Sequence, residues 1–159
     1  MIECFVFIIS PNKISFSKNM KTYRMSILSD PKKLAKARRF VEEISLDAGF
    51  KRRDAHLIML AVDEACTNII RHSYVGDTSK KINIKVAAKK KKGYNASLTI
   101  KIRDYGKKPD VKKISGKKPR KVKPGGLGVY FIRKIMDEVV YNTGVKKGTE
   151  LTLMKYLLQ

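Results

Sequence analysis

Two spacing patterns of apolar residues, one typical of helices and one typical of strands, alternate along the chain. The order in which they follow one another constrains the fold most strongly. Helical spacing of apolar residues predicts helices over about residues 32–48, 53–73 and 127–136. Alternating apolar residues predict strands at about 22–28, 82–86, 98–102, 138–143 and 149–157. Because several strands follow one another at hairpin spacing, we expect a mixed, largely antiparallel sheet. Three helices of this size can cover one face of it, so the expected fold is an α/β two-layer sandwich.

Local signals support the boundaries of the first helix. Ser29-Asp30-Pro31 places a capping side chain before a proline, and Gly49 follows the last apolar position. The chain has 159 residues, 43% of them apolar, which suits one globular domain. We therefore predict a single domain over residues 22–159, preceded by an N-terminal extension, residues 1–21, whose order the sequence leaves open.

The chain is strongly basic, with 36 Lys and Arg against 14 Asp and Glu and a formal net charge of +22. That charge invites nucleic acid or an anionic membrane surface, but an acidic protein partner or a generally basic proteome would explain it equally. No apolar run approaches the roughly 20 residues of a membrane span. Cys4 and Cys66 lie far apart without metal-ligand spacing, so we expect a reduced, cytoplasmic protein.

A carboxylate and a carboxamide lie one turn apart on the predicted helix 53–73. Glu64 and Asn68 are four residues apart, and Arg71 falls in the same sector. A face with an acid, an amide and a guanidinium can activate a nucleophile, hold Mg²⁺ through oxygen and meet phosphate. An ordinary solvated helix face would have the same composition.

Two glycine-containing turns carry the other candidate residues. Asp104 ends a predicted strand, and Gly106 follows in the turn. A carboxylate at the end of a strand can accept a hydrogen bond from an exocyclic amine such as that of adenine, and the glycine lets the backbone approach a flat base. The backbone N–H groups of Gly125, Gly126, Leu127 and Gly128 precede a predicted helix and suit phosphate. Thr149 could add a hydroxyl nearby. Each motif alone also fits a plain turn or hairpin.

The ordered combination of these motifs is more specific than any one of them. AVDEACTNIIRHSY, DYGKKPD and GGLGVYFIRKIMDEVVY, followed by GTELTLMKYL, resemble the successive ATP-binding boxes and closing strand of the GHKL (Bergerat-fold) ATPase superfamily. The resemblance is to the anti-sigma-factor serine kinases of bacterial partner-switching systems. It covers roughly residues 22–157. Lys107-Lys108-Pro109 depart from the small residues that often follow the second box.

The resemblance implies a histidine-kinase-like ATPase fold, ATP and Mg²⁺ as cofactors, and a role for each matching residue. Glu64 would be the general base, Asn68 the Mg²⁺ ligand and Asp104 the residue that reads adenine, with Gly106 beside it. The segment Gly125–Gly128 would line the phosphates at the end of a lid over residues 106–125. Thr149 would lie near the base, and Arg71 would be a candidate phosphate contact.

The resemblance also implies the activity and the partners. The expected function is an ATP-dependent serine protein kinase that phosphorylates an anti-anti-sigma partner and sequesters a sigma factor. Members of this family often form homodimers. One alternative is a non-catalytic, ATP-binding partner switch. The other is a basic nucleic-acid-binding protein, which the sequence favours less because it has no aromatic-interleaved basic motif, helix-turn-helix signature or zinc site.

Overall fold

The computed structural model describes residues 20–91, 95–110 and 127–157. The helices and strands follow in the order β1 (Met20–Leu28), α1 (Leu34–Asp47), α2 (Arg52–Asn68), β2 (Lys81–Lys91), β3 (Asn95–Arg103), α3 (Leu127–Ile135), β4 (Glu138–Asn142) and β5 (Glu150–Leu157). Residues 1–19 of the predicted extension, most of the predicted lid, and Gly125 and Gly126 lie outside the described residues.

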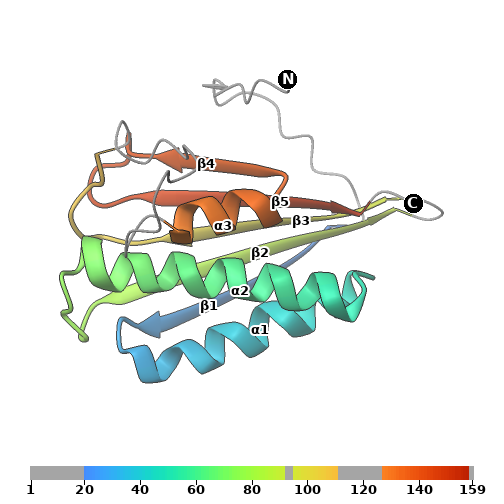
Figure 1. Cartoon of the computed structure of the whole chain (residues 1–159), viewed down its shortest axis with the longest axis horizontal. Helices are drawn as coiled ribbons and strands as arrows, with labels where there is room; N and C mark the ends of the chain where they lie inside the picture. Colours follow the sequence, from blue (N-terminus) through green and yellow to red (C-terminus); the bar gives the residue numbers. More distant parts are fainter. Residues whose placement is uncertain (1–19, 92–94, 111–126, 158–159) are drawn as a thin grey trace.

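The five strands form one sheet in the order β1-β2-β3-β5-β4, and each neighbouring pair is antiparallel. The three helices cover one face of this sheet (Figure 1). The predicted α/β two-layer sandwich is therefore confirmed. The sheet expected to be mixed and largely antiparallel is antiparallel throughout its described strands. The β1–β2 connection runs through two helices, α1 and α2, and returns the chain antiparallel to β1, while β2–β3 and β4–β5 follow each other directly as antiparallel pairs.

The core lies between the sheet and the helices. Inward side chains of β2 and β3 are at most 1% exposed: Ile82, Ile84, Val86, Leu98, Ile100 and Ile102. They pack in one hydrophobic cluster with α2 residues such as Ile58 and Val62. Full burial of one such side chain contributes about 1.5–3 kcal/mol. The alternate positions point to the other face of the sheet, which none of the described helices covers (Figure 1).

The first helix begins and ends as its sequence predicts. The Asp30 carboxylate accepts a hydrogen bond from the Lys32 backbone amide at 2.9 Å, and Pro31 starts the first turn. Gly49 has a φ of 101°, a left-handed conformation that glycine adopts without strain, and its amide donates to Leu46 at 2.9 Å. This turn carries the chain into α2, which supplies one wall of the site.

The C-terminal end of α2 widens into a π-helical turn, Ile69–Ser73. The Tyr74 amide donates to the Ile69 carbonyl five residues back, at 2.9 Å. This wider turn changes the directions of Ser73 and Tyr74 relative to a regular α-helix.

Within the described part of the chain, no helix is long and apolar enough to cross a membrane.

Candidate nucleotide site

A cavity of about 380 Å³ lies where the end of α2, the loop after β3, the start of α3 and strands β4 and β5 meet. It is lined by Ala65, Asn68, Ile69, His72, Ser73, Asp104, Lys107, Pro109, Asp110, Val129, Tyr141, Thr149 and Leu151. Its size falls within the ~300–1,000 Å³ of ligand pockets, and a mostly apolar wall with a few polar groups is typical of such sites.

Asp104 is the most buried acid at this cavity, with 2% of its surface exposed. Its amide donates to the Thr149 carbonyl at 3.0 Å, which fixes the end of β3 beside β5. Its Oδ1 accepts two hydrogen bonds, one from the Ser73 hydroxyl and one from the Gly106 amide, the latter at 2.9 Å. No donor among the described residues bonds Oδ2. Asp104 therefore offers an oriented acceptor to a ligand with a donor group.

Two glycines allow the loop that carries Asp104 to lie so close to its neighbours. A Cβ on Gly106 would stand 2.7 Å from the Ser73 carbonyl carbon. Gly148 has a φ of 69°, and a Cβ there would stand 2.6 Å from the Asp104 carbonyl carbon and from Tyr105 Cα. Both clashes are with backbone, so a side chain at either position would displace the loop.

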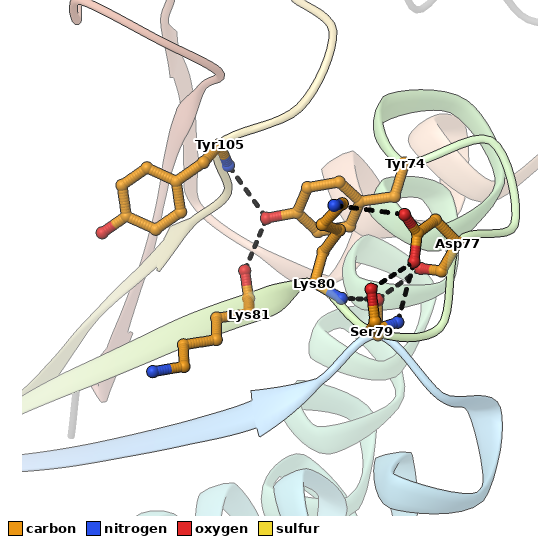
Figure 2. A network of polar contacts seen from close by, with 7 residues as sticks. Tyr74, Asp77, Ser79, Lys80, Lys81 and Tyr105 are labelled. Carbon is orange, nitrogen blue, oxygen red and sulfur yellow. Dashed lines mark hydrogen bonds and ion pairs between the residues drawn. The ribbon is translucent and has the colours of Figure 1, made fainter.

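Tyr74 holds the same loop in place through hydrogen bonds of its hydroxyl group. The Tyr74 hydroxyl accepts from the Tyr105 amide at 2.9 Å and donates to the Lys81 carbonyl at the start of β2 (Figure 2). Burial raises the pKa of the Tyr74 hydroxyl above its usual value, so it keeps its proton near neutral pH. On the other side of the loop, the Lys107 amide donates to the Ser73 carbonyl at 2.9 Å.

The helix α2 presents the acid and the amide predicted from its sequence. Asn68 lines the cavity. Glu64, one turn earlier, lies against the first turn of α3, because a Cβ on Gly128 would stand 2.5 Å from Glu64 Cδ and 2.9 Å from Cγ. Leu127, beside Gly128, is 44% exposed. Glu64 and Gly128 therefore adjoin each other just outside the cavity lining.

Thr149 also lines the cavity and is 5% exposed. Its hydroxyl oxygen is buried and has no hydrogen-bond partner among the described residues. An orphaned buried hydroxyl costs about 1–3 kcal/mol unless a ligand or water satisfies it. Arg71, by contrast, is exposed and does not line the cavity. The structure thus brings together Asn68, Asp104 and Thr149 but leaves Arg71 outside.

Several lining residues were not predicted from the sequence. Ala65, Ile69 and His72 share the cavity with Asn68. Ala65 and His72 lie three and four residues from Asn68, so helical spacing was an available signal for these two, but not for the adjacent Ile69. Ser73 depends on the π-helical turn, which has no sequence signature here. Tyr141 and Leu151 come from distant strands, so only the sheet order could have placed them.

The residues present fit a nucleotide with a metal held largely by its phosphates. No cluster of three or more His, Cys, Asp or Glu in residues 20–91, 95–110 and 127–157 could hold a metal ion by itself. Mg²⁺ at phosphate sites needs only one or two protein oxygens in addition to phosphate and water. The Asn68 carboxamide can provide one, while Ala65, Ile69, Val129 and Leu151 offer apolar walls for a flat base.

One buried side chain beside this site is structural. Cys66 is fully buried within the hydrophobic cluster. Burial, together with the nearby Asp63 charge, raises the pKa of its thiol to about 12. The thiolate is therefore not formed near neutral pH, and Cys66 serves the packing of the core.

Known serine-protein kinases are similar to this chain over most of its length. The serine-protein kinase RsbW of Oceanobacillus iheyensis is 27% identical over 149 residues, which cover 89% of this chain and 90% of the relative. RsbW of Halalkalibacterium halodurans is 27% identical over 145 residues, covering 86% and 84% respectively.

A solved structure is similar in fold. The crystal structure of the RsbU and RsbW domains of a Mycobacterium tuberculosis protein matches 87% of this chain with a TM-score of 0.55 and 18% identity. This chain spans 33% of that longer one. Residues 27–155 match the family model described as the histidine kinase-like ATPase domain. The chain belongs to the histidine kinase-like ATPase domain family.

Proposed function

We propose that this protein is an ATP-dependent serine protein kinase that phosphorylates an anti-anti-sigma protein and sequesters a sigma factor. The observation that carries the proposal is Asp104, whose buried carboxylate keeps one oxygen for a ligand at the floor of the cavity. Membership of the ATPase family and the names of the RsbW relatives support it.

ATP would bind with its base in the cavity. The exocyclic amine would donate to Asp104 Oδ2, and the Thr149 hydroxyl would satisfy a polar atom of the ring. The phosphates would lie toward the start of α3, whose first N–H groups and helix dipole favour negative charge. Gly125 and Gly126 stay predicted phosphate contacts. When bound, Mg²⁺ would be held by Asn68 and the phosphates and would neutralise charge on the transferred group.

Glu64 is well placed for a general base because it lies at the α3 end of the cavity, where the phosphates are expected. Its carboxylate would accept the proton of the partner's serine hydroxyl. The serine oxygen would then bond the γ-phosphorus as the bond to the β,γ-bridging oxygen breaks, and ADP would leave. The protein's contribution is thus to position the two reactants and remove one proton.

Glu64→Gln tests this assignment. The amide keeps the shape of the side chain but cannot accept the serine proton, so we expect ATP binding to persist and phosphate transfer to a candidate anti-anti-sigma protein to be lost. Glu43→Gln, which neutralises an exposed carboxylate of α1, is the matched control and should retain transfer. Labelled ATP would follow both reactions.

Two outcomes of that experiment would contradict the proposal. Undiminished transfer by Glu64→Gln would show that another group takes the proton. If the wild type binds ATP and captures the partner but transfers no phosphate, the protein is a non-catalytic partner switch.

A further inference from the structure

Three basic residues stand in one row across the face of the sheet that the helices leave uncovered. The strand register pairs Arg24 of β1 with Lys85 of β2, and Lys85 with Lys101 of β3. Lys85 is exposed and alternates with the buried Ile84 and Val86, so it points away from the helices. Neighbouring strands lie about 4.8 Å apart, so these residues, the cation row, span roughly 10 Å.

The cation row is unfavourable for folding on its own. Like charges directly opposite each other on a sheet destabilise it. Lys101 is offset by Glu150 of β5, with 2.8 Å between the ammonium nitrogen and the carboxylate. Arg24 and Lys85 are exposed and have no acidic partner among the described residues. An arrangement that costs stability and remains accessible is expected where charge serves binding.

The rows on either side of the cation row hold mostly short side chains. On one side the register aligns Thr22, Ala87 and Thr99, and on the other it aligns Ser26, Asn83 and Arg103. Apart from Arg103, whose guanidinium lies over the Tyr105 ring, these side chains are shorter than lysine or arginine. No outward position of β1, β2 or β3 in the described strands carries Asp or Glu. Over β1 and β2 the cation row is therefore flanked by shorter side chains.

We propose that the cation row binds an acidic segment of a protein partner. A second copy packed over this row by the same face would bring like charges together. Sheet faces that bind single-stranded nucleic acid use aromatic side chains for base stacking, and the described outward positions of β1, β2 and β3 contain none. The adjoining Tyr105 ring is already covered on one side by the Arg103 guanidinium, and its hydroxyl accepts a hydrogen bond from Asn83. Carboxylates on a protein match the closely spaced cations. This inference does not depend on phosphate transfer by Glu64.

The test is binding of a fluorescent poly-glutamate peptide to the full chain at physiological ionic strength. Arg24→Glu/Lys85→Glu reverses two charges in the cation row, and Arg52→Glu/Arg53→Glu reverses two exposed charges at the start of α2. Both variants have the same net charge. We expect the first to bind roughly tenfold more weakly and the second to change by less than about twofold. Circular dichroism would confirm folding, and Lys85→Gln replaces the first variant if it is unfolded.

Three results would overturn the proposal. Equal losses in both double variants would show that only the overall charge attracts the peptide. Tighter binding of duplex DNA than of poly-glutamate, lost in the cation-row variant, would assign the face to nucleic acid. A wild-type dimer that dissociates in the cation-row variant would assign it to a second copy of this chain.

Discussion

Replacing Asp104 by asparagine changes one atom in the group that we expect to read the base. In the structure, Oδ1 accepts from the Ser73 hydroxyl and the Gly106 amide, and Oδ2 has no donor among the described residues. The asparagine oxygen can take the place of Oδ1 and keep these contacts. Its NH₂ group then occupies the position of Oδ2, so a donor replaces an acceptor at the cavity.

The expected loss of ATP affinity follows from that exchange. A hydrogen bond to a charged group contributes about 1.5–3 kcal/mol, and a buried donor left facing another donor costs about 1–3 kcal/mol. Since part of the second cost is relieved by small movements, we expect a net loss of about 2–4 kcal/mol. This corresponds to roughly 30- to 1,000-fold weaker ATP binding.

Titration calorimetry with ATP and with inosine triphosphate separates this effect from a general defect. Inosine has a carbonyl in place of the exocyclic amine, so it should bind the wild type weakly and Asp104→Asn relatively better. Asp47→Asn, which removes an exposed charge at the end of α1, should bind both nucleotides as the wild type does. If Asp104→Asn weakens both nucleotides equally, Asp104 does not read the amine and our account of the base is wrong.

Three further predictions concern the glycines and the buried thiol. Gly128→Ala places a Cβ against the Glu64 side chain, so kcat for phosphate transfer should fall even at saturating ATP, whatever loss of ATP affinity the altered phosphate turn brings; unchanged kcat would argue against Glu64 as the base. Gly148→Ala clashes with loop backbone and should lower the unfolding free energy in urea by about 2 kcal/mol or more, whereas Gly76→Ala, also at positive φ but in open space, should cost clearly less. Folding raises the pKa of the Cys66 thiol from 9.0 to about 12, so its contribution is present below pH 9 and is lost as pH rises above it. Wild-type stability should therefore fall by about 1 kcal/mol more than that of Cys66→Ala between about pH 7 and about pH 10, and parallel pH profiles would contradict this.

Local sequence was sufficient to predict most of the fold. Alternation places Ile82, Ile84 and Val86 on one face of a strand, and the structure buries all three. Asp30 and Gly49 mark the helix boundaries through local hydrogen bonds and backbone conformation. The strand order was not predictable in this way, because β3 pairs with β5 across a long connection and nothing local to either strand specifies its neighbour.

The site was predictable only in part, for the same reason. Asn68, Asp104 and Thr149 could be chosen from motifs, and the structure places all three at the cavity. The Ser73 contact with Asp104 could not, because it depends on a π-helical turn and on an approach between segments 31 residues apart. Arg71 shares a helical sector with Asn68 in a regular helix, but it lies in that same π-helical turn and is exposed.

A crystal structure with a non-hydrolysable ATP analogue and Mg²⁺ tests the central claim most directly. The account predicts the adenine ring in the cavity between α2 and β5, with its exocyclic amine donating to Asp104 Oδ2 and the phosphates at the start of α3. An adenine ring bound elsewhere, or a base in the cavity that leaves Asp104 Oδ2 without a hydrogen bond, would contradict it.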